Sequence, residues 1–193
     1  FTASMTTLEQ LRSTGVSLAL GGGAARGIAH IGGLKALAEA GVAVHAVAGT
    51  SVGSVVGAAL AAGRDWRWML EEARRLRWGD LVQPAVPRMG LFVPDRLEQY
   101  LERALGVRLF SQLSIPFAAV AVDIGAGEEA VLREGHLAPA IRASCSVPGI
   151  FAPVSLGGRL LVDGGLLNDV PADVARSLAD LPVLAVKLNG GVR

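Results

Sequence analysis

Residues 46–60 read AVAGTSVGSVVGAAL, and this stretch decides the fold. Residues 44–48 form a short apolar run that predicts a buried strand, and small apolar residues at 52–62 predict a helix. The Gly-x-Ser-x-Gly turn between them, Gly49 to Gly53, is typical of a nucleophile elbow, in which the serine adopts a strained backbone. The stretch therefore indicates that Ser51 is a nucleophile; the alternative is a glycine-rich turn that only packs.

The same region also has the length of a membrane span. Residues 40–63 form a stretch of 24 residues without a formal charge, which is long enough to cross a bilayer. Gly41 and Gly49 interrupt it, and it carries His45, Thr50 and Ser51. We therefore favour a buried strand followed by a buried helix.

The elements on either side of the serine turn define the fold class. A buried strand is expected at 16–20, a glycine loop at 21–23 and a helix at 25–40, before the strand at 44–48. This β-α-β beginning predicts a parallel sheet with helices on both faces. Ligands of such sheets bind at the carboxyl ends of the strands, where the glycine loop and Ser51 both fall. Further helices are expected at 65–78, 94–105, 136–143 and 171–179, and further strands at 117–122, 129–133, 154–156, 160–162 and 183–188, with a loop at 79–93.

The glycine loop, GGGAARG at 21–27, fits no nucleotide motif. In the dinucleotide pattern that begins at Gly21, Arg26 occupies the position of the third glycine, and a P-loop would need a Lys-Ser/Thr pair. A loop of small residues that presents N–H groups at a helix N-terminus is suited to holding an oxyanion. Arg26 would brace this loop or attract an anionic head group; the alternative is a solvated charge.

Asp163 is the candidate for the proton acceptor. It precedes Gly164 and Gly165, and an Asp in this position is often only a turn residue. Hydrolase triads of the elbow type run Ser, acid, His along the chain. All histidines of this sequence, His30, His45 and His136, precede Asp163.

Composition excludes several classes of function. The chain has 18 basic and 17 acidic residues, a net charge of +1, and no basic run, so we expect no nucleic-acid partner. Cys145 is the single cysteine, which excludes a disulfide framework and predicts a reducing compartment. We expect Cys145 to be a small buried side chain. The length of 193 residues and the lack of a linker predict a single domain over 1–193.

Three motifs in this order, GGGAARG, GTSVG and DGG, resemble the patatin-like phospholipases, including bacterial single-domain members and the catalytic domain of neuropathy target esterase. The resemblance covers nearly the whole chain. It extends to residues 30–32 behind the glycine loop, to residues 143–153, which include Val147-Pro148-Gly149, and to residues 168–171. The set of three is far more specific than any one motif.

The resemblance implies a three-layer α/β/α sandwich with a mainly parallel central sheet. It also implies a serine ester hydrolase that cleaves acyl esters of phospholipids or lysophospholipids, without a metal or cofactor. Ser51 would be the nucleophile and Asp163 its base. The remaining implied site residues are the oxyanion-hole donors Gly22, Gly23 and Ala24 and the supporting residues Arg26, Gly27, Gly49, Gly53, Gly164 and Gly165.

Two other functions remain open from the sequence. The same dyad would serve an acyltransferase or thioesterase, and a catalytically silent lipid-binding module would keep the fold. The expected partner is an acyl lipid, with peripheral contact to a membrane surface through Arg74, Arg75 and Arg77. We expect the protein in the cytoplasm, associated peripherally with the inner face of the membrane. Domains of this family often continue with further helices, so we expect part of the substrate groove to lie beyond Arg193.

Overall fold

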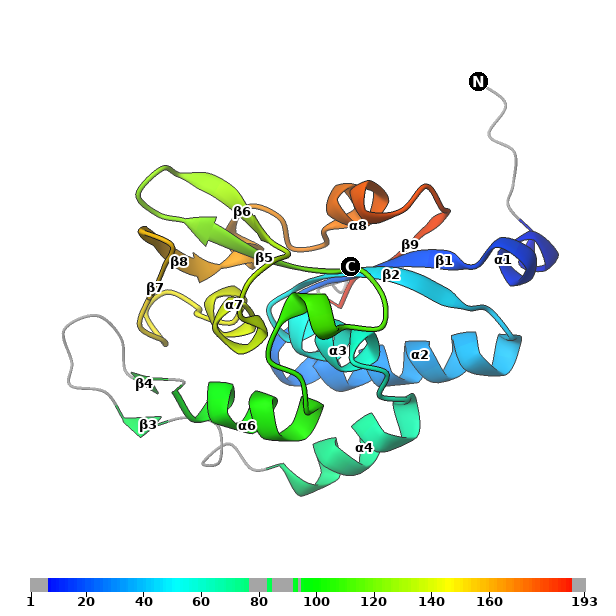
Figure 1. Ribbon diagram of the computed structural model, residues 1–193, viewed down its shortest axis with the longest axis horizontal. Coiled ribbons are helices and arrows are strands. Elements are labelled where there is room, and N and C mark those ends of the chain that lie inside the picture. Colours follow the sequence, from blue (N-terminus) through cyan, green and yellow to red (C-terminus); the bar gives the residue numbers. More distant parts are fainter. Residues whose placement is uncertain (1–6, 77–82, 85–91, 94, 189–193) are drawn as a thin grey trace, which may run out of the picture.

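The computed structural model describes residues 7–76, 83–84, 92–93 and 95–188, and it is built around a seven-stranded sheet (Figure 1). The strand order is β7-β8-β5-β2-β1-β9, and β6 also pairs with β5. Strands β5, β2, β1 and β9 are parallel to one another, whereas β6, β7 and β8 join by antiparallel pairing. The strands are β1 Val16–Leu20, β2 Val44–Thr50, β5 Phe117–Asp123, β6 Glu128–Leu132, β7 Val154–Leu156, β8 Arg159–Asp163 and β9 Val183–Val186; β3 Gln83–Pro84 and β4 Phe92–Val93 form a separate pair.

Helices cover both faces of the sheet, which gives the three layers expected from the sequence. Helix α8 packs on one face, and α2, α3 and α7 pack on the other (Figure 1). Helix α4 packs against α2 and α3, and α6 packs against α7. The helices are α1 Leu8–Thr14, α2 Ile28–Ala40, α3 Val52–Ala61, α4 Trp66–Arg75, α6 Asp95–Leu105, α7 Leu137–Ser144 and α8 Ala172–Leu178, with short 3-10 helices η1 Ala24–Gly27, η2 Phe110–Gln112 and η3 Gly164–Leu166.

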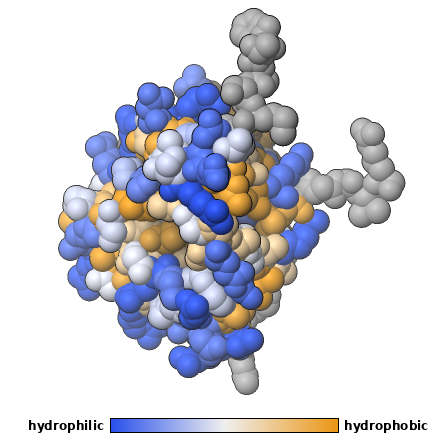
Figure 2. All heavy atoms as spheres, turned by 90° about the vertical axis from the view of Figure 1, so that its right-hand side faces the viewer, coloured by the Kyte–Doolittle hydropathy of each residue, from blue (hydrophilic) through white to orange (hydrophobic). Residues whose placement is uncertain are grey.

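The central strands are buried on both faces. Every residue of β1 is buried, as expected for a parallel strand covered by two helical layers. On the α8 side the packing is through small side chains, chiefly Ala19, Ala48 and Ala118 of the sheet against Val174 and Ala175 of the helix. The larger core lies on the other side of the sheet. Figure 2 shows one outer face, on which hydrophilic side chains interrupt the hydrophobic surface.

Strand register brings the two predicted reactive residues to one place. Thr50 of β2 pairs with Val120 of β5, and Asp163 of β8 pairs with Ala121, the next residue of β5. Strand β6 pairs with both Val120 and Ala121 and so occupies one edge of β5. Strands β2 and β8 must therefore both pair with the other edge of β5, one following the other along it. Asp163 therefore lies one register position beyond Thr50, where the chain turns into α3 at Ser51.

The uncharged stretch at 40–63 folds as β2 followed by α3, as predicted. Across the described residues, each helix is too short or too polar to cross a bilayer. Arg77, Trp78, Pro94 and most of the loop expected at 79–93 lie outside the described residues.

Candidate active site

Ser51 occupies the turn between β2 and α3 in a strained conformation. Its φ of 54° and ψ of −127° are unusual for a residue with a side chain, and such conformations cost about 1–3 kcal/mol. Two neighbours hold this turn: the Ser51 N–H donates to Ser144 Oγ at 2.9 Å, and Ser54 Oγ donates to the Ser51 carbonyl at 2.6 Å. The expected strained turn is confirmed.

The glycines around Ser51 are sites of close backbone approach. A Cβ at Gly49 would collide with the Gly53 carbonyl, and a Cβ at Gly53 would collide with the carbonyl of Leu20 in β1. At Gly27 a Cβ would overlap the side chain of Val52. Strand β2, helix α3 and the glycine loop can come together only because these positions lack a side chain.

Asp163 lies beside this turn and is only 6% exposed. Its Oδ1 accepts a hydrogen bond from the Gly165 N–H at 2.8 Å. Its Oδ2 is buried and has no well-aligned hydrogen-bond partner among the described residues, although the Ser51 hydroxyl lies close enough to interact with the carboxylate. Loose hydrogen bonds of this kind are common in sites without substrate. The arrangement leaves a carboxylate oxygen able to accept a proton.

The environment of Asp163 makes the carboxylate a stronger base. Burial raises its pKa above the ordinary value, and the negative charge of Asp169 raises it further. The hydrogen bonds from the Ser51 side chain and the Gly165 N–H act in the opposite direction, but burial is the largest effect.

Two of the three predicted oxyanion-hole N–H groups are open. The Gly22 N–H donates to the Asp169 carbonyl at 3.0 Å and is therefore occupied. The N–H groups of Gly23 and Ala24 have no acceptor among the described residues. Ala24 has a positive φ of 47°, as the loop turns into η1.

Asp169 is a site residue that the sequence analysis did not identify. Besides binding Gly22 through its carbonyl, it places Oδ1 only 2.8 Å from the position that a Cβ at Gly22 would take. That position is also 3.5 Å from the Ser51 Cβ. Asp169 belongs to the segment 168–171 noted in the family resemblance, which was the available signal.

Ser144 is a second residue that sequence reasoning missed. Its hydroxyl accepts from the Ser51 N–H and donates to the Val120 carbonyl at 2.6 Å. The side chain is fully buried and so ties the serine turn to β5. It also lies in a segment that carries the resemblance, residues 143–153.

No hydrogen bond joins a histidine to Ser51 or Asp163 in the described part of the chain. His30 is buried, its Nε2 lies 2.8 Å from the Gly21 carbonyl oxygen, and burial lowers its pKa, which favours the neutral ring. Nε2 must carry the proton to donate to that oxygen. His45 and His136 are exposed, at the start of β2 and at the N-cap of α7.

Cys145 and Arg26 flank the site. Burial raises the pKa of the Cys145 thiol to about 12, so the thiol is neutral. Cys145 is partly rather than fully buried, because its side chain lines the cavity described in the next paragraph. Arg26 is exposed on η1.

A cavity of about 430 Å³ runs from Ser51 into the space between α2, α3, α4 and α6. Its walls are mainly apolar and include Val55, Ala59, Met69, Leu97 and Phe151. Ligand cavities of this size and lining are typical of sites for apolar molecules. Among the described residues, no group of three or more His, Cys, Asp or Glu side chains could hold a metal ion.

A strained serine between a strand and a helix of an α/β sheet has the geometry of a nucleophile elbow, the turn of many hydrolases. Comparison with known proteins defines the family. The sequence profile of the patatin-like phospholipases matches residues 18–176, and the chain belongs to this family.

Relatives and a solved structure agree with this assignment. The chain is 42% identical over 181 residues to an uncharacterized NTE family protein of Mycobacterium tuberculosis, covering 91% of this chain and 49% of that protein. It is 36% identical over 184 residues to mouse patatin-like phospholipase domain-containing protein 6, covering 90% of this chain and 13% of that protein. The chain thus spans half or less of these relatives. The crystal structure of VipD from Legionella pneumophila matches with a TM-score of 0.64 at 16% identity, over 82% of this chain and 47% of that one, which shows the fold.

Proposed function

We propose that the protein is a serine ester hydrolase that cleaves acyl esters of phospholipids or lysophospholipids through Ser51 and Asp163. One observation carries the proposal: the strained Ser51 lies at an apolar cavity beside the buried Asp163, whose Oδ2 is unpaired in the described structure. An acyl chain fits the cavity because its walls are apolar.

In the proposed reaction, Ser51 Oγ attacks the ester carbonyl carbon while Asp163 takes the hydroxyl proton. The N–H groups of Gly23 and Ala24 stabilise the negative oxygen of the tetrahedral intermediate. Asp163 then gives the proton to the leaving alcohol oxygen, and the acyl group stays on Ser51. A water molecule, deprotonated by Asp163, cleaves this ester, and the proton returns to Ser51 as the fatty acid leaves.

Other acceptors and acyl donors would use the same chemistry. An alcohol in place of water would make the protein an acyltransferase, and a thioester donor would make it a thioesterase. We place the activity in the cytoplasm, at the inner face of the membrane, because the single Cys145 suits a reducing compartment and the substrate is a lipid.

The decisive experiment is reaction with a fluorophosphonate probe followed by mass spectrometry. Phosphonylation should occur on Ser51 and disappear in Ser51→Ala, together with turnover of a chromogenic acyl ester. Unchanged labelling in Ser51→Ala would exclude the mechanism. The controls are His30→Gln, His45→Gln and His136→Gln, each of which should keep activity within about tenfold, ~1.4 kcal/mol. If one of these variants lost activity as completely as Ser51→Ala, that histidine would belong to a catalytic triad and the proposed dyad would be wrong.

A further inference from the structure

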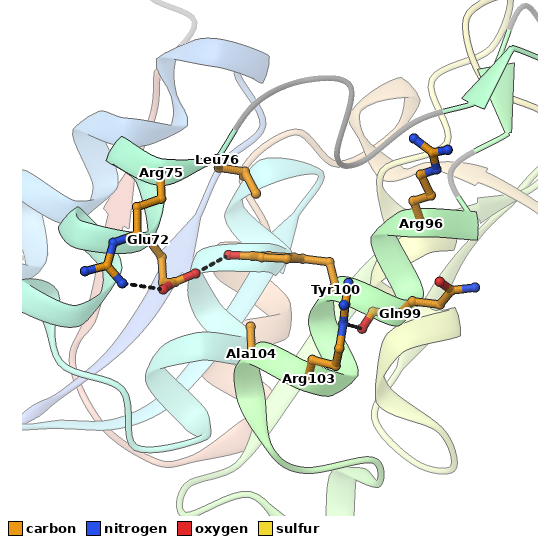
Figure 3. A pocket seen from close by; sticks show the side chains of 8 residues that line it. All are labelled: Glu72, Arg75, Leu76, Arg96, Gln99, Tyr100, Arg103 and Ala104. Atoms are coloured by element: carbon orange, nitrogen blue, oxygen red, sulfur yellow. Dashed lines mark hydrogen bonds and ion pairs between the residues drawn. The ribbon is translucent and has the colours of Figure 1, made fainter.

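A second space, called the groove below, lies on the outer side of the molecule between α4 and α6. It has a volume of about 590 Å³ and is open to solvent. Arg75 of α4 and Arg96, Gln99 and Arg103 of α6 line it (Figure 3). Positions 96, 99 and 103 recur at helical spacing, so they share one face of α6.

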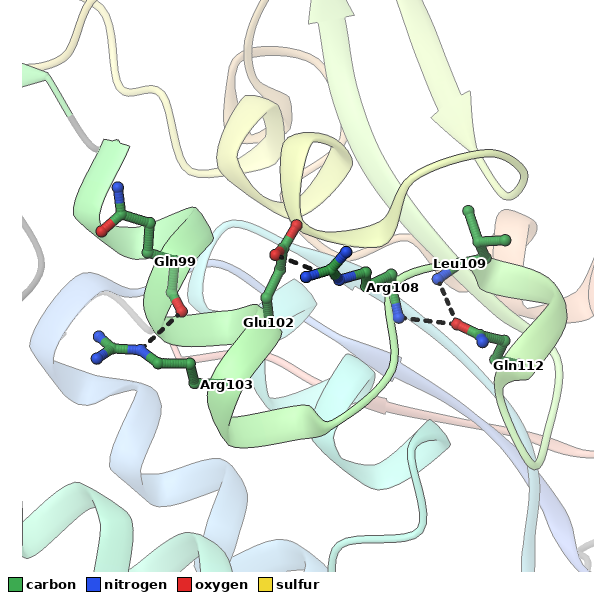
Figure 4. A network of polar contacts seen from close by, with 6 residues as sticks. All are labelled: Gln99, Glu102, Arg103, Arg108, Leu109 and Gln112. Carbon is green, nitrogen blue, oxygen red and sulfur yellow. Dashed lines mark hydrogen bonds and ion pairs between the residues drawn. The ribbon is translucent and has the colours of Figure 1, made fainter.

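Helix α6 separates its charges by face. Glu98 binds Arg142 of α7 at 2.8 Å, and Glu102 lies 3.6 Å from Arg108. Figure 4 shows Glu102 directed toward Arg108, whereas Arg103 extends the other way and donates to the Gln99 carbonyl. The acidic side chains of α6 at 98 and 102 are therefore engaged away from the groove that carries its arginines.

Within the part of the chain that the structure describes, Glu72 is the acidic residue that lines the groove, and its side chain is also engaged. It accepts a hydrogen bond from the Tyr100 hydroxyl at 3.0 Å and lies 3.8 Å from Arg75 (Figure 3). Burial and Glu72 raise the pKa of Tyr100 to about 12, so its hydroxyl stays protonated and remains a donor. Among the described lining residues, three arginines and one glutamate give a formal charge of +2.

The groove adjoins the cavity of the proposed active site. Glu72, Leu76 and Tyr100 line both spaces, so the hydrogen-bonded pair of Glu72 and Tyr100 lies at their common wall. A basic groove beside an apolar acyl cavity matches a lipid surface, which presents phosphate groups next to acyl chains. Arginine suits this partner because one guanidinium group can donate hydrogen bonds to two oxygens of the same phosphate.

We propose that the groove lined by Arg75, Arg96 and Arg103 binds phosphate head groups of an anionic lipid surface and so docks the protein beside its acyl cavity. This inference rests on the lipid hydrolase function proposed above. The groove binds head groups of the lipid surface, so it has no part in the reaction at Ser51.

The test measures binding of the intact chain to vesicles in a Ser51→Ala background, which prevents hydrolysis. Vesicles of phosphatidylcholine are compared with vesicles of equimolar phosphatidylcholine and phosphatidylglycerol. The protein should bind the anionic vesicles more tightly. The double variant Arg96→Gln/Arg103→Gln should lower this binding about tenfold, since each arginine near an anionic surface contributes several-fold. Arg75→Gln provides a second, independent variant.

The matched control is Arg133→Gln/Arg159→Gln, which removes the same charge from two exposed positions, one directly after β6 and one at the start of β8. The proposal would be overturned if the control variant lost as much binding to anionic vesicles as Arg96→Gln/Arg103→Gln. It would also be overturned if the Ser51→Ala protein with all its arginines bound both kinds of vesicle equally. Turnover of a short soluble ester is measured with Ser51 intact. It should be the same with and without Arg96→Gln/Arg103→Gln. Absence of turnover in both proteins would contradict the hydrolase function. The vesicle experiment would still test whether the groove binds head groups.

Discussion

Ser51 donates its backbone N–H to the hydroxyl of Ser144 at 2.9 Å, so a buried side chain of α7 holds the strained turn in place. Ser144→Ala should destabilise the fold by about 1–3 kcal/mol, because it leaves the Ser51 N–H and the Val120 carbonyl without their partner. It should also lower kcat more than it changes KM, since the position of Ser51 Oγ is no longer fixed. Urea denaturation and steady-state kinetics measure both effects.

The control for Ser144→Ala is Ser155→Ala, on the exposed part of β7. This variant should leave stability and kcat unchanged. If Ser144→Ala lost stability while kcat was retained, Ser144 would be a packing residue without a positioning role.

Asp163→Asn should abolish turnover and stabilise the protein. The amide cannot accept the Ser51 proton, and loss of a general base costs about 10²–10⁴ in rate. Because burial raises the pKa of Asp163 in the folded state, its ionised form is less favourable there than in the unfolded chain. The Tm of Asp163→Asn should therefore be higher at neutral pH, and the difference should vanish as the pH falls below the ordinary aspartate pKa. An equal or lower Tm at neutral pH would contradict this account of the site.

Asp169→Asn should change the pH profile of the reaction. Asp163 works in its ionised form, so kcat/KM should fall with decreasing pH through a pKa above that of an ordinary aspartate. Removal of the negative charge at 169 should move this acidic limb to lower pH, because that charge raises the pKa of Asp163. Asp180→Asn, at an exposed position, is the control and should leave the profile in place. An acidic limb that does not move would exclude electrostatic coupling between Asp163 and Asp169.

Gly22→Ala should impair the reaction with little effect on folding outside the loop. The added methyl would lie 2.8 Å from Asp169 Oδ1 and 3.5 Å from the Ser51 Cβ, so the loop must shift. This shift would displace the N–H groups of Gly23 and Ala24; loss of an oxyanion donor typically costs ~10²–10³ in kcat, and we expect a loss of ~10². Gly33→Ala in α2 is the control, because its Cβ would meet nothing within 4 Å; there alanine should stabilise the helix by about 0.5–1 kcal/mol. A Gly22→Ala protein with full kcat would remove this loop from the mechanism.

Local patterns in the sequence predicted the elements that carry the site, but not the contacts that join them. The apolar run before Ser51 and the glycines at 49 and 53 were sufficient to predict β2, the turn and α3, because these features act within a few residues. The roles of Ser144 and Asp169 depend on pairing between β2, β5 and β8, which are distant in the chain. Helix α1 was missed although its signal was local: Thr7 and Gln10 form a capping box at its start.

Val55→Phe should shorten the chain length that the enzyme accepts. Val55 of α3 lines the cavity near Ser51 and is only partly buried, so a larger side chain can extend into the space of an acyl chain. We expect kcat/KM for long-chain esters to fall by about tenfold or more, with acetyl esters little affected, because a short acyl group does not reach beyond the serine. Val131→Phe, the same change at an exposed position of β6, should leave both substrates unaffected. Kinetics over a series of p-nitrophenyl esters of increasing chain length measures the effect. An equal loss for acetyl and long-chain esters would mean that the cavity does not hold the acyl chain.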